Sequence, residues 1–80
     1  MEIKLVAYGI AKDILGSNEL SLSLDKGNTV IDLKNELTKM FPAFEELSSL
    51  RFAVNEEYRP DNFELNYNDE VVIIPPVSGG

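Results

Sequence analysis

The residues with the clearest chemical potential in this sequence form its C-terminal end, Pro75-Pro76-Val77-Ser78-Gly79-Gly80. The two prolines lack a backbone N–H and favour extended geometry, so a strand that precedes them must end there. Gly79 and Gly80 have no Cβ, so they can pass through a channel too narrow for other residues and leave the terminal carboxylate sterically open. A carboxylate is a poor electrophile at neutral pH and needs activation, for instance as an acyl-adenylate. Chemistry at Gly80 therefore requires another protein, because this sequence contains no ATP-binding motif.

Elsewhere the side chains give little indication of catalysis. Histidine and cysteine are both absent, which removes the commonest general base, metal ligand and strong nucleophile. The acid pairs Glu45-Glu46 and Glu56-Glu57 are predicted to be solvated surface, since adjacent residues rarely converge on one substrate atom. The tail is thus the one candidate site. The alternative is that Gly79-Gly80 merely ends the chain without a function.

Length and charge limit the class of protein. Eighty residues make one domain, and the net charge of −7 comes from 14 acids and 7 bases. The bases are scattered singly, so nucleic acid is excluded as a partner, because it requires a positive face. The acidic surface favours solubility and a basic partner. The apolar runs are too short for a membrane span and no secretory signal is visible, so we expect no membrane association and a cytoplasmic location.

Hydrophobic periodicity predicts five strands and one main helix. Strands are expected at residues 3–8, 19–25, 51–55 and 71–74, with a short return strand at Tyr58. Residues 11–15 form a short helical turn that Gly16 closes. Thr29 and Asp32 resemble a capping box that begins the main helix, and Pro42 ends it. Its apolar stripe comprises Val30, Leu33, Leu37, Met40 and Phe41.

This order of elements predicts an α+β fold. Strands in runs around one helix form a mixed sheet of about five strands that the helix covers on one face. The first and last strands are the most apolar, so we expect them to pair in parallel at the centre of the sheet. That arrangement is the β-grasp of ubiquitin-like proteins. The predicted domain spans residues 1–76, followed by a flexible carrier tail at 77–80.

The sequence resembles the MoaD/ThiS family of sulfur carriers, which includes the small subunits of molybdopterin synthase. The most specific part is the segment from Asp69 to Gly80, DEVVIIPPVSGG, and Ala53 to Tyr58, AVNEEY, supports it. Further agreement comes from the first strand entering Lys12-Asp13-Ile14-Leu15-Gly16, and the resemblance covers essentially the whole chain.

The resemblance implies a reaction cycle in which this chain is not an enzyme by itself. An E1-like enzyme would adenylate the carboxylate of Gly80 with ATP and magnesium, and a sulfur donor would convert it to a thiocarboxylate. The tail would then enter the large catalytic subunit of molybdopterin synthase. There the sulfur would pass to cyclic pyranopterin monophosphate and build the molybdopterin dithiolene. Gly80 would be the covalent carrier, Gly79 its slender approach, and no cofactor would be bound by this chain.

The resemblance also implies a docking surface beside the tail. The partner-binding residues expected from it are Tyr8, Tyr58, Ile74, Pro75, Pro76, Val77 and Ser78. We expect Tyr8, Tyr58 and Ile74 to lie near one another, because strands one and five pair centrally. The alternative is that any of these three side chains belongs to the core.

Three other functions remain open at this stage. The chain could carry sulfur for thiamine synthesis or tRNA thiolation, although such relatives commonly lack Pro-Pro-Val-Ser ahead of Gly-Gly. It could be a ubiquitin-like modifier attached to lysines of target proteins. It could also be a plain β-grasp interaction module without covalent chemistry.

Overall fold

A five-stranded sheet packed against one long helix makes up the computed structural model, which describes residues 1–46 and 50–75. The elements in chain order are β1 (Glu2–Ala7), α1 (Gly9–Leu15), β2 (Glu19–Ser23), α2 (Val30–Met40), the 3₁₀ turn η1 (Pro42–Glu46), β3 (Arg51–Val54), β4 (Glu57–Tyr58) and β5 (Glu70–Ile74).

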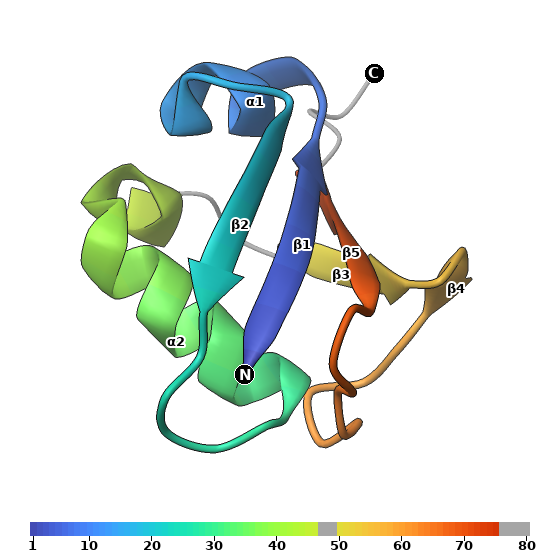
Figure 1. The fold of residues 1–80 in the computed structure, drawn as a ribbon. Helices are drawn as coiled ribbons and strands as arrows, with labels where there is room; N and C mark the ends of the chain where they lie inside the picture. The colour runs from blue at the N-terminus through green and yellow to red at the C-terminus, as the bar shows by residue number, and fades with distance from the viewer. Residues whose placement is uncertain (47–49, 76–80) are drawn as a thin grey trace.

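The sheet has the order β2-β1-β5-β3-β4 (Figure 1). β1 and β5 pair in parallel, whereas β2 with β1, β5 with β3, and β3 with β4 pair antiparallel. The continuous apolar run of β5 fits its central place in the sheet, since such runs are typical of central strands with little contact with water. The predicted ubiquitin-like β-grasp, with its central parallel pair, is confirmed.

The helix α2 begins at the predicted capping box. Thr29 Oγ1 accepts a hydrogen bond from Asp32 N (3.4 Å), and Thr29 N donates to Asp32 Oδ2 (3.1 Å). The Thr29 hydroxyl also donates to the Asp32 carboxylate (2.7 Å). These bonds satisfy two amides that would otherwise be unpaired at the helix start. The bonds that the Thr29 hydroxyl and then the Thr29 N–H donate to the Asp32 carboxylate also lower the pKa of Asp32 from its ordinary value, because they favour the charged carboxylate.

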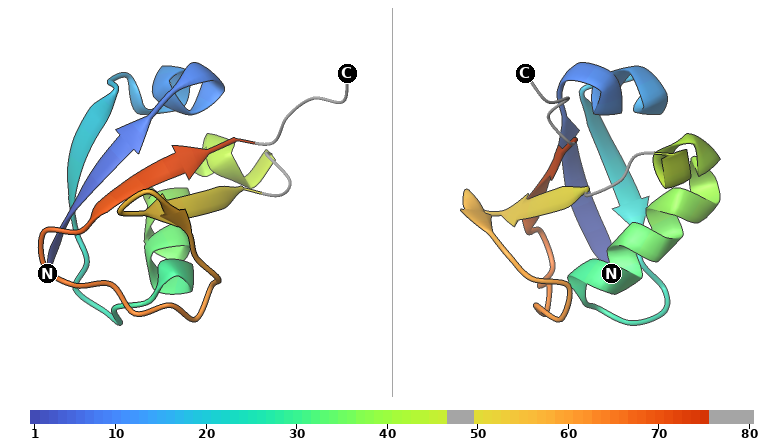
Figure 2. Two further views of the ribbon diagram at one scale, coloured as in Figure 1. Left: turned by 90° about the vertical axis from the view of Figure 1, so that its right-hand side faces the viewer. Right: turned by 180° about the vertical axis from the view of Figure 1, so that it is seen from behind.

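The core lies between α2 and one face of the sheet, and Figure 2 shows the helix crossing that face. Val30, Leu33 and Leu37 are buried there, as the helical spacing predicts. The prediction is wrong for Met40, which is 50% exposed. Met40 is the last helical residue, and beyond it Phe44 of η1 is buried and packs edge-on against Phe41.

The tight turn between β3 and β4 contains two residues with left-handed backbones. Asn55 has φ 49° and Glu56 has φ 74°, between the paired residues Val54 and Glu57. A two-residue hairpin loop with φ > 0 at both positions is of type I′, whose twist matches that of the flanking strands. The turn leads into β4, so the short return strand predicted at Tyr58 is confirmed. Asn tolerates this conformation, but Glu does so at a cost.

Candidate functional site

The predicted carrier tail follows directly from the central strand of the sheet. β5 ends at Ile74, and the half-buried Pro75, which has no N–H, comes next. Pro76, Val77, Ser78, Gly79 and Gly80 lie outside the described residues, as does the predicted boundary at 76–77. Their roles therefore stay predictions, while the surface from which the tail departs can be built residue by residue.

An apolar row crosses the open face of the sheet, opposite α2. The strand registers pair Val6 with Val72, Val72 with Ala53, and Ala53 with Tyr58. These four residues, here called the apolar row, alternate with the inward-facing core residues of their strands, so their side chains point away from α2. Val6 and Ala53 are only 8% exposed although none of the described helices covers this face, so they form the floor of the row.

Next to the apolar row, toward the tail, lies a second row that contains Ile74. Ile74 pairs with Arg51 on one side. On its other side, Ala7 pairs with Ile73, so the following residue, Tyr8, lies beside Ile74. The backbone of Tyr8 is extended (φ −131°, ψ 163°), which turns its side chain to the open face. The apolar surface is therefore continuous with the point where the tail begins.

The two tyrosines are surface residues. Tyr8 is 61% and Tyr58 is 64% exposed, so the alternative that they belong to the core is wrong. Ile74 is half-buried. Tyr8 follows β1 and Tyr58 lies in β4, so β5 and β3 stand between them, a separation of about 14 Å at the usual strand spacing. They lie on the same face but do not touch, and they bound the apolar surface at opposite sides.

The half of the open face farther from the tail is charged. Lys4 forms ion pairs with Glu19 (3.3 Å) and Glu70 (3.9 Å), and all three side chains are about half exposed. Lys4 also pairs in register with Ser21. The open face is thus apolar around Val6, Val72 and Ala53, and it is polar toward the start of β5 and along β2, where Glu19 pairs in register with Val6. Such exposed apolar patches commonly mark binding surfaces.

Sequence reasoning missed Val6, Val72 and Ala53 as part of this surface. A signal existed in the strand pattern. In β1 the outward residues change from Glu2 and Lys4 to Val6 as the chain approaches the tail end, and in β5 they change from Glu70 to Val72. An apolar residue at an outward position is unusual on a solvated sheet face. Recognising the row requires the register, which places these residues next to one another.

The body of the domain shows no competing site in residues 1–46 and 50–75. Those residues contain no group of three or more acids that could hold a metal ion. The one buried acid among them, Asp69, accepts hydrogen bonds from Asn55 Nδ2 (3.0 Å) and Asn66 N (2.7 Å). Asp69 thus secures the loop before β5. None of the helices described is long and apolar enough to cross a membrane.

The family of the chain follows from a comparison of its sequence with known families. The ThiS family model matches residues 7–80, from the end of β1 through the tail. The chain belongs to the ThiS family. A curated relative in Arabidopsis thaliana, named molybdopterin synthase sulfur carrier subunit, is 38% identical over 81 residues. That match covers 100% of this chain and 84% of the relative.

Solved structures share the fold of this ThiS-family chain. A protein from Pyrococcus furiosus, provisionally described as subunit 1 of a molybdopterin converting factor, has a TM-score of 0.86 and 27% identity. The match covers 96% of this chain and 99% of that one. Small archaeal modifier protein 1 from Methanosarcina acetivorans has a TM-score of 0.80 and 28% identity, covering 99% and 96%. The fold therefore occurs in proteins whose names describe different uses.

Proposed function

We propose that this chain is the sulfur-carrier subunit of a molybdopterin synthase and that Gly80 holds the sulfur. The observation that carries this proposal is the match of this whole chain to 84% of the Arabidopsis relative, whose name states that function. The apolar surface beside the end of β5 supports it, because a carrier whose tail enters a partner needs a docking surface next to that tail.

In this proposal the chain supplies a reacting group and the partners supply the catalysis. An E1-like enzyme uses ATP and Mg²⁺ to join the Gly80 carboxylate to AMP, releasing pyrophosphate. Sulfide from a donor then attacks the acyl carbon and displaces AMP, which leaves a thiocarboxylate. In the large synthase subunit, the thiocarboxylate gives its sulfur to cyclic pyranopterin monophosphate, and water restores the carboxylate. This chain holds no cofactor in the cycle.

The body of the domain positions the tail and anchors it to the partners. β5 is held on both sides by β1 and β3, so the point where the tail begins is fixed relative to the apolar row. The large subunit would contact Tyr8, Tyr58 and Ile74 while Pro75, Pro76, Val77 and Ser78 lead into its channel. Tyrosine and apolar anchors are enriched at the centres of such interfaces.

Intact mass spectrometry tests the carrier function. The chain is incubated with the E1-like enzyme, ATP and a sulfide donor, and its mass should increase by the difference between sulfur and oxygen. The matched control lacks Gly80 and should show no increase, while its melting temperature stays unchanged because the described core ends at Ile73. Addition of the large subunit and the pterin substrate should then return the chain to its starting mass. Thiocarboxylate on the truncated chain would refute Gly80 as the carrier.

A second candidate, a protein modifier, is favoured by the likeness to the archaeal modifier protein. It requires the same activated carboxylate but ends in an isopeptide bond to a lysine. The same incubation, repeated in a lysate, distinguishes the sulfur carrier from the protein modifier. Conjugates that survive thiol reductants and contain Gly80 in an isopeptide bond to a lysine would support the modifier, whereas thiocarboxylate alone supports the carrier.

A further inference from the structure

The two edges of the sheet differ in how well they are protected. β4 is an edge strand of two residues, and Pro60 follows it closely. β2 is the other edge, and it pairs with β1 over five consecutive residues. It contains no proline, no bulge and no lysine, which are the devices that usually prevent an edge from pairing with another chain. β2 therefore offers a regular, unprotected edge.

The hydrogen-bond pattern shows which groups of β2 face outward. Leu24 N donates to Met1 O (2.7 Å), and Ala7 N donates to Asn18 O (3.0 Å). Residues that bond to the partner strand alternate with residues that do not along an antiparallel ladder. The backbone N–H and C=O groups of Leu22 and Leu20 therefore also face β1, while those of Ser21 and Ser23 face away from it. Lys4 is the register partner of Ser21, so its backbone should face away from β2. Its N–H indeed donates to Asp69 O (3.3 Å), on the side of β5.

The outward backbone groups of Ser21 and Ser23 have no hydrogen-bond partner among the described residues. At the start of the strand, Glu19 differs from them. Its N–H donates to Ser17 Oγ (3.2 Å), and its carbonyl accepts from the Ser17 hydroxyl (2.7 Å). Four backbone groups, the N–H and C=O of each serine, are thus available to an added strand.

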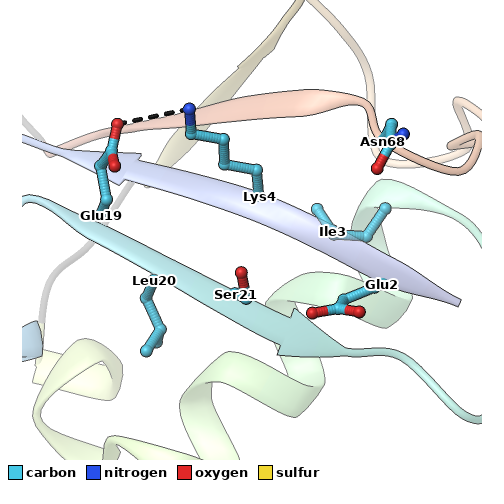
Figure 3. A pocket seen from close by; sticks show the side chains of 7 residues that line it. All are labelled: Glu2, Ile3, Lys4, Glu19, Leu20, Ser21 and Asn68. Carbon is cyan, nitrogen blue, oxygen red and sulfur yellow. Dashed lines mark ion pairs between the residues drawn. The ribbon is translucent and has the colours of Figure 1, made fainter.

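The surroundings of this edge indicate the charge of its partner. A pocket of about 420 Å³ lies on the open face over β1 and β2 and includes Glu2, Lys4, Glu19 and Ser21 in its lining (Figure 3). Lys4 is shared between Glu19 and Glu70, and Glu2 forms no ion pair among the described residues. The pocket therefore carries excess negative charge, in a chain whose net charge is −7.

The other side of the edge is apolar. Leu20 also contributes to the lining of the pocket, but its side chain lies on the helix side of β2 and is partly exposed (Figure 3). Alternate side chains of an added strand would therefore meet an acidic surface on one side and an apolar one on the other. A second copy of this chain fits poorly at this edge. Antiparallel pairing about Ser21 would place Glu19 diagonally opposite Asp25 of the other copy, where the two carboxylates repel each other. The two molecules would also repel each other through their net charges of −7 each.

We propose that the edge of β2 binds an extended segment of another protein, in which basic and apolar residues alternate, as an added antiparallel strand. The backbone bonds to Ser21 and Ser23 provide the attachment, and basic side chains enter the pocket between Glu2 and Glu19. At one end the site adjoins the apolar row, because Glu19 pairs in register with Val6. The bonds to Ser21 and Ser23 nevertheless involve only the β2 edge, so the proposal does not depend on the sulfur-carrier function.

Nuclear magnetic resonance with the ¹⁵N-labelled full chain tests the site. The probe is a blocked peptide, Lys-Val-Lys-Val-Lys-Val-Lys. We expect saturable shifts of the Ser21 and Ser23 amides and slower hydrogen exchange at both. N-methylation of the peptide amides that face β2 should weaken binding at least tenfold, and so should replacement of every peptide lysine by glutamate. Equal binding of the N-methylated peptide, or shifts confined to the apolar row, would overturn the proposal.

A matched pair of variants tests the same edge from the protein side. Ser21→Pro removes the outward N–H without removing a bond to β1, a position where edge strands tolerate proline, and should weaken binding at least tenfold. Ser21→Thr keeps the N–H and should bind as the parent does. Equal binding by Ser21→Pro would overturn the proposal. A homodimer of the parent chain that Ser21→Pro dissociates would also overturn it, because a second copy would then occupy the edge. If Ser21→Pro fails to fold, the N-methylated peptide decides the question.

Discussion

The apolar row depends on a few outward-facing apolar side chains. Val6, Val72 and Ala53 occupy outward positions where a solvated strand usually has polar side chains. Their small or branched side chains leave a flat floor, while Tyr58 stands at its border with most of its ring exposed. A large partner side chain could rest on this floor and exclude water from it. Tyr58 is therefore the residue whose truncation best separates binding from folding.

Replacement of Tyr58 by alanine should weaken binding to the large synthase subunit at least tenfold, because an anchor at the border of the apolar row is lost. Its stability should stay within about 0.5 kcal/mol of the parent, as is usual for an exposed residue. Titration calorimetry and thermal unfolding measure the two quantities. Tyr67→Ala is the matched control, since Tyr67 is equally exposed but lies in the loop before β5. Equal losses for both variants would contradict a specific role for Tyr58.

The left-handed backbone of Glu56 has a measurable cost in folding stability. Its φ of 74° disfavours any side chain with a Cβ, whereas glycine adopts it freely. Glu56→Gly should therefore stabilise the domain by about 0.5–1 kcal/mol in chemical denaturation. Asn55→Gly should gain less, because Asn tolerates this conformation. A loss of stability in Glu56→Gly would show that its side chain makes a contact that outweighs the strain.

At the scale of elements, each strand or helix that the sequence predicted has a strong local signal. Leu20, Leu22 and Leu24 alternate with polar residues, and Thr29 with Asp32 has the spacing of a capping box; both patterns are properties of a few neighbouring residues. The apolar row is different, because Val6 and Val72 meet only through the pairing of strands far apart in sequence. The exposure of Met40 was also missed, since helical spacing does not show where the covering sheet ends.

The capping box of α2 predicts how stability depends on pH. Its hydrogen bonds lower the pKa of Asp32 in the folded chain, so their stabilisation is complete above the ordinary pKa of 3.8 and is lost as the pH falls through the lower folded value. The stability difference between the parent and Asp32→Asn should therefore shrink below about pH 4. Thr29→Ala, which removes the N-cap side chain of α2, should cost about 1 kcal/mol at neutral pH. A difference that stays constant down to pH 2 would exclude this explanation.

The whole molecule is organised around β1 and β5, which are paired on both sides. Their amides should exchange with solvent only through global unfolding, at a free energy of about 5 kcal/mol or more. In β2 the protection should alternate, with Leu22 slow and Ser21 and Ser23 fast. Native-state hydrogen exchange measured by NMR gives these values residue by residue. Strong protection of Ser21 in the free chain would mean that another segment covers the edge.

The parallel pairing of β1 with β5 also determines when the chain can fold in the cell. Leu5 and Ala7 of β1 pair with Val71 and Ile73 of β5, which are made more than sixty residues later than β1. Until Ile74 has left the ribosome, β1 lacks one neighbour and β3 has only the short β4. A nascent or prematurely ended chain therefore lacks the centre of its sheet and exposes apolar side chains to chaperones and proteases. Because β5 is followed at once by the tail, a folded body shows that synthesis has already reached the residues next to the proposed carrier group.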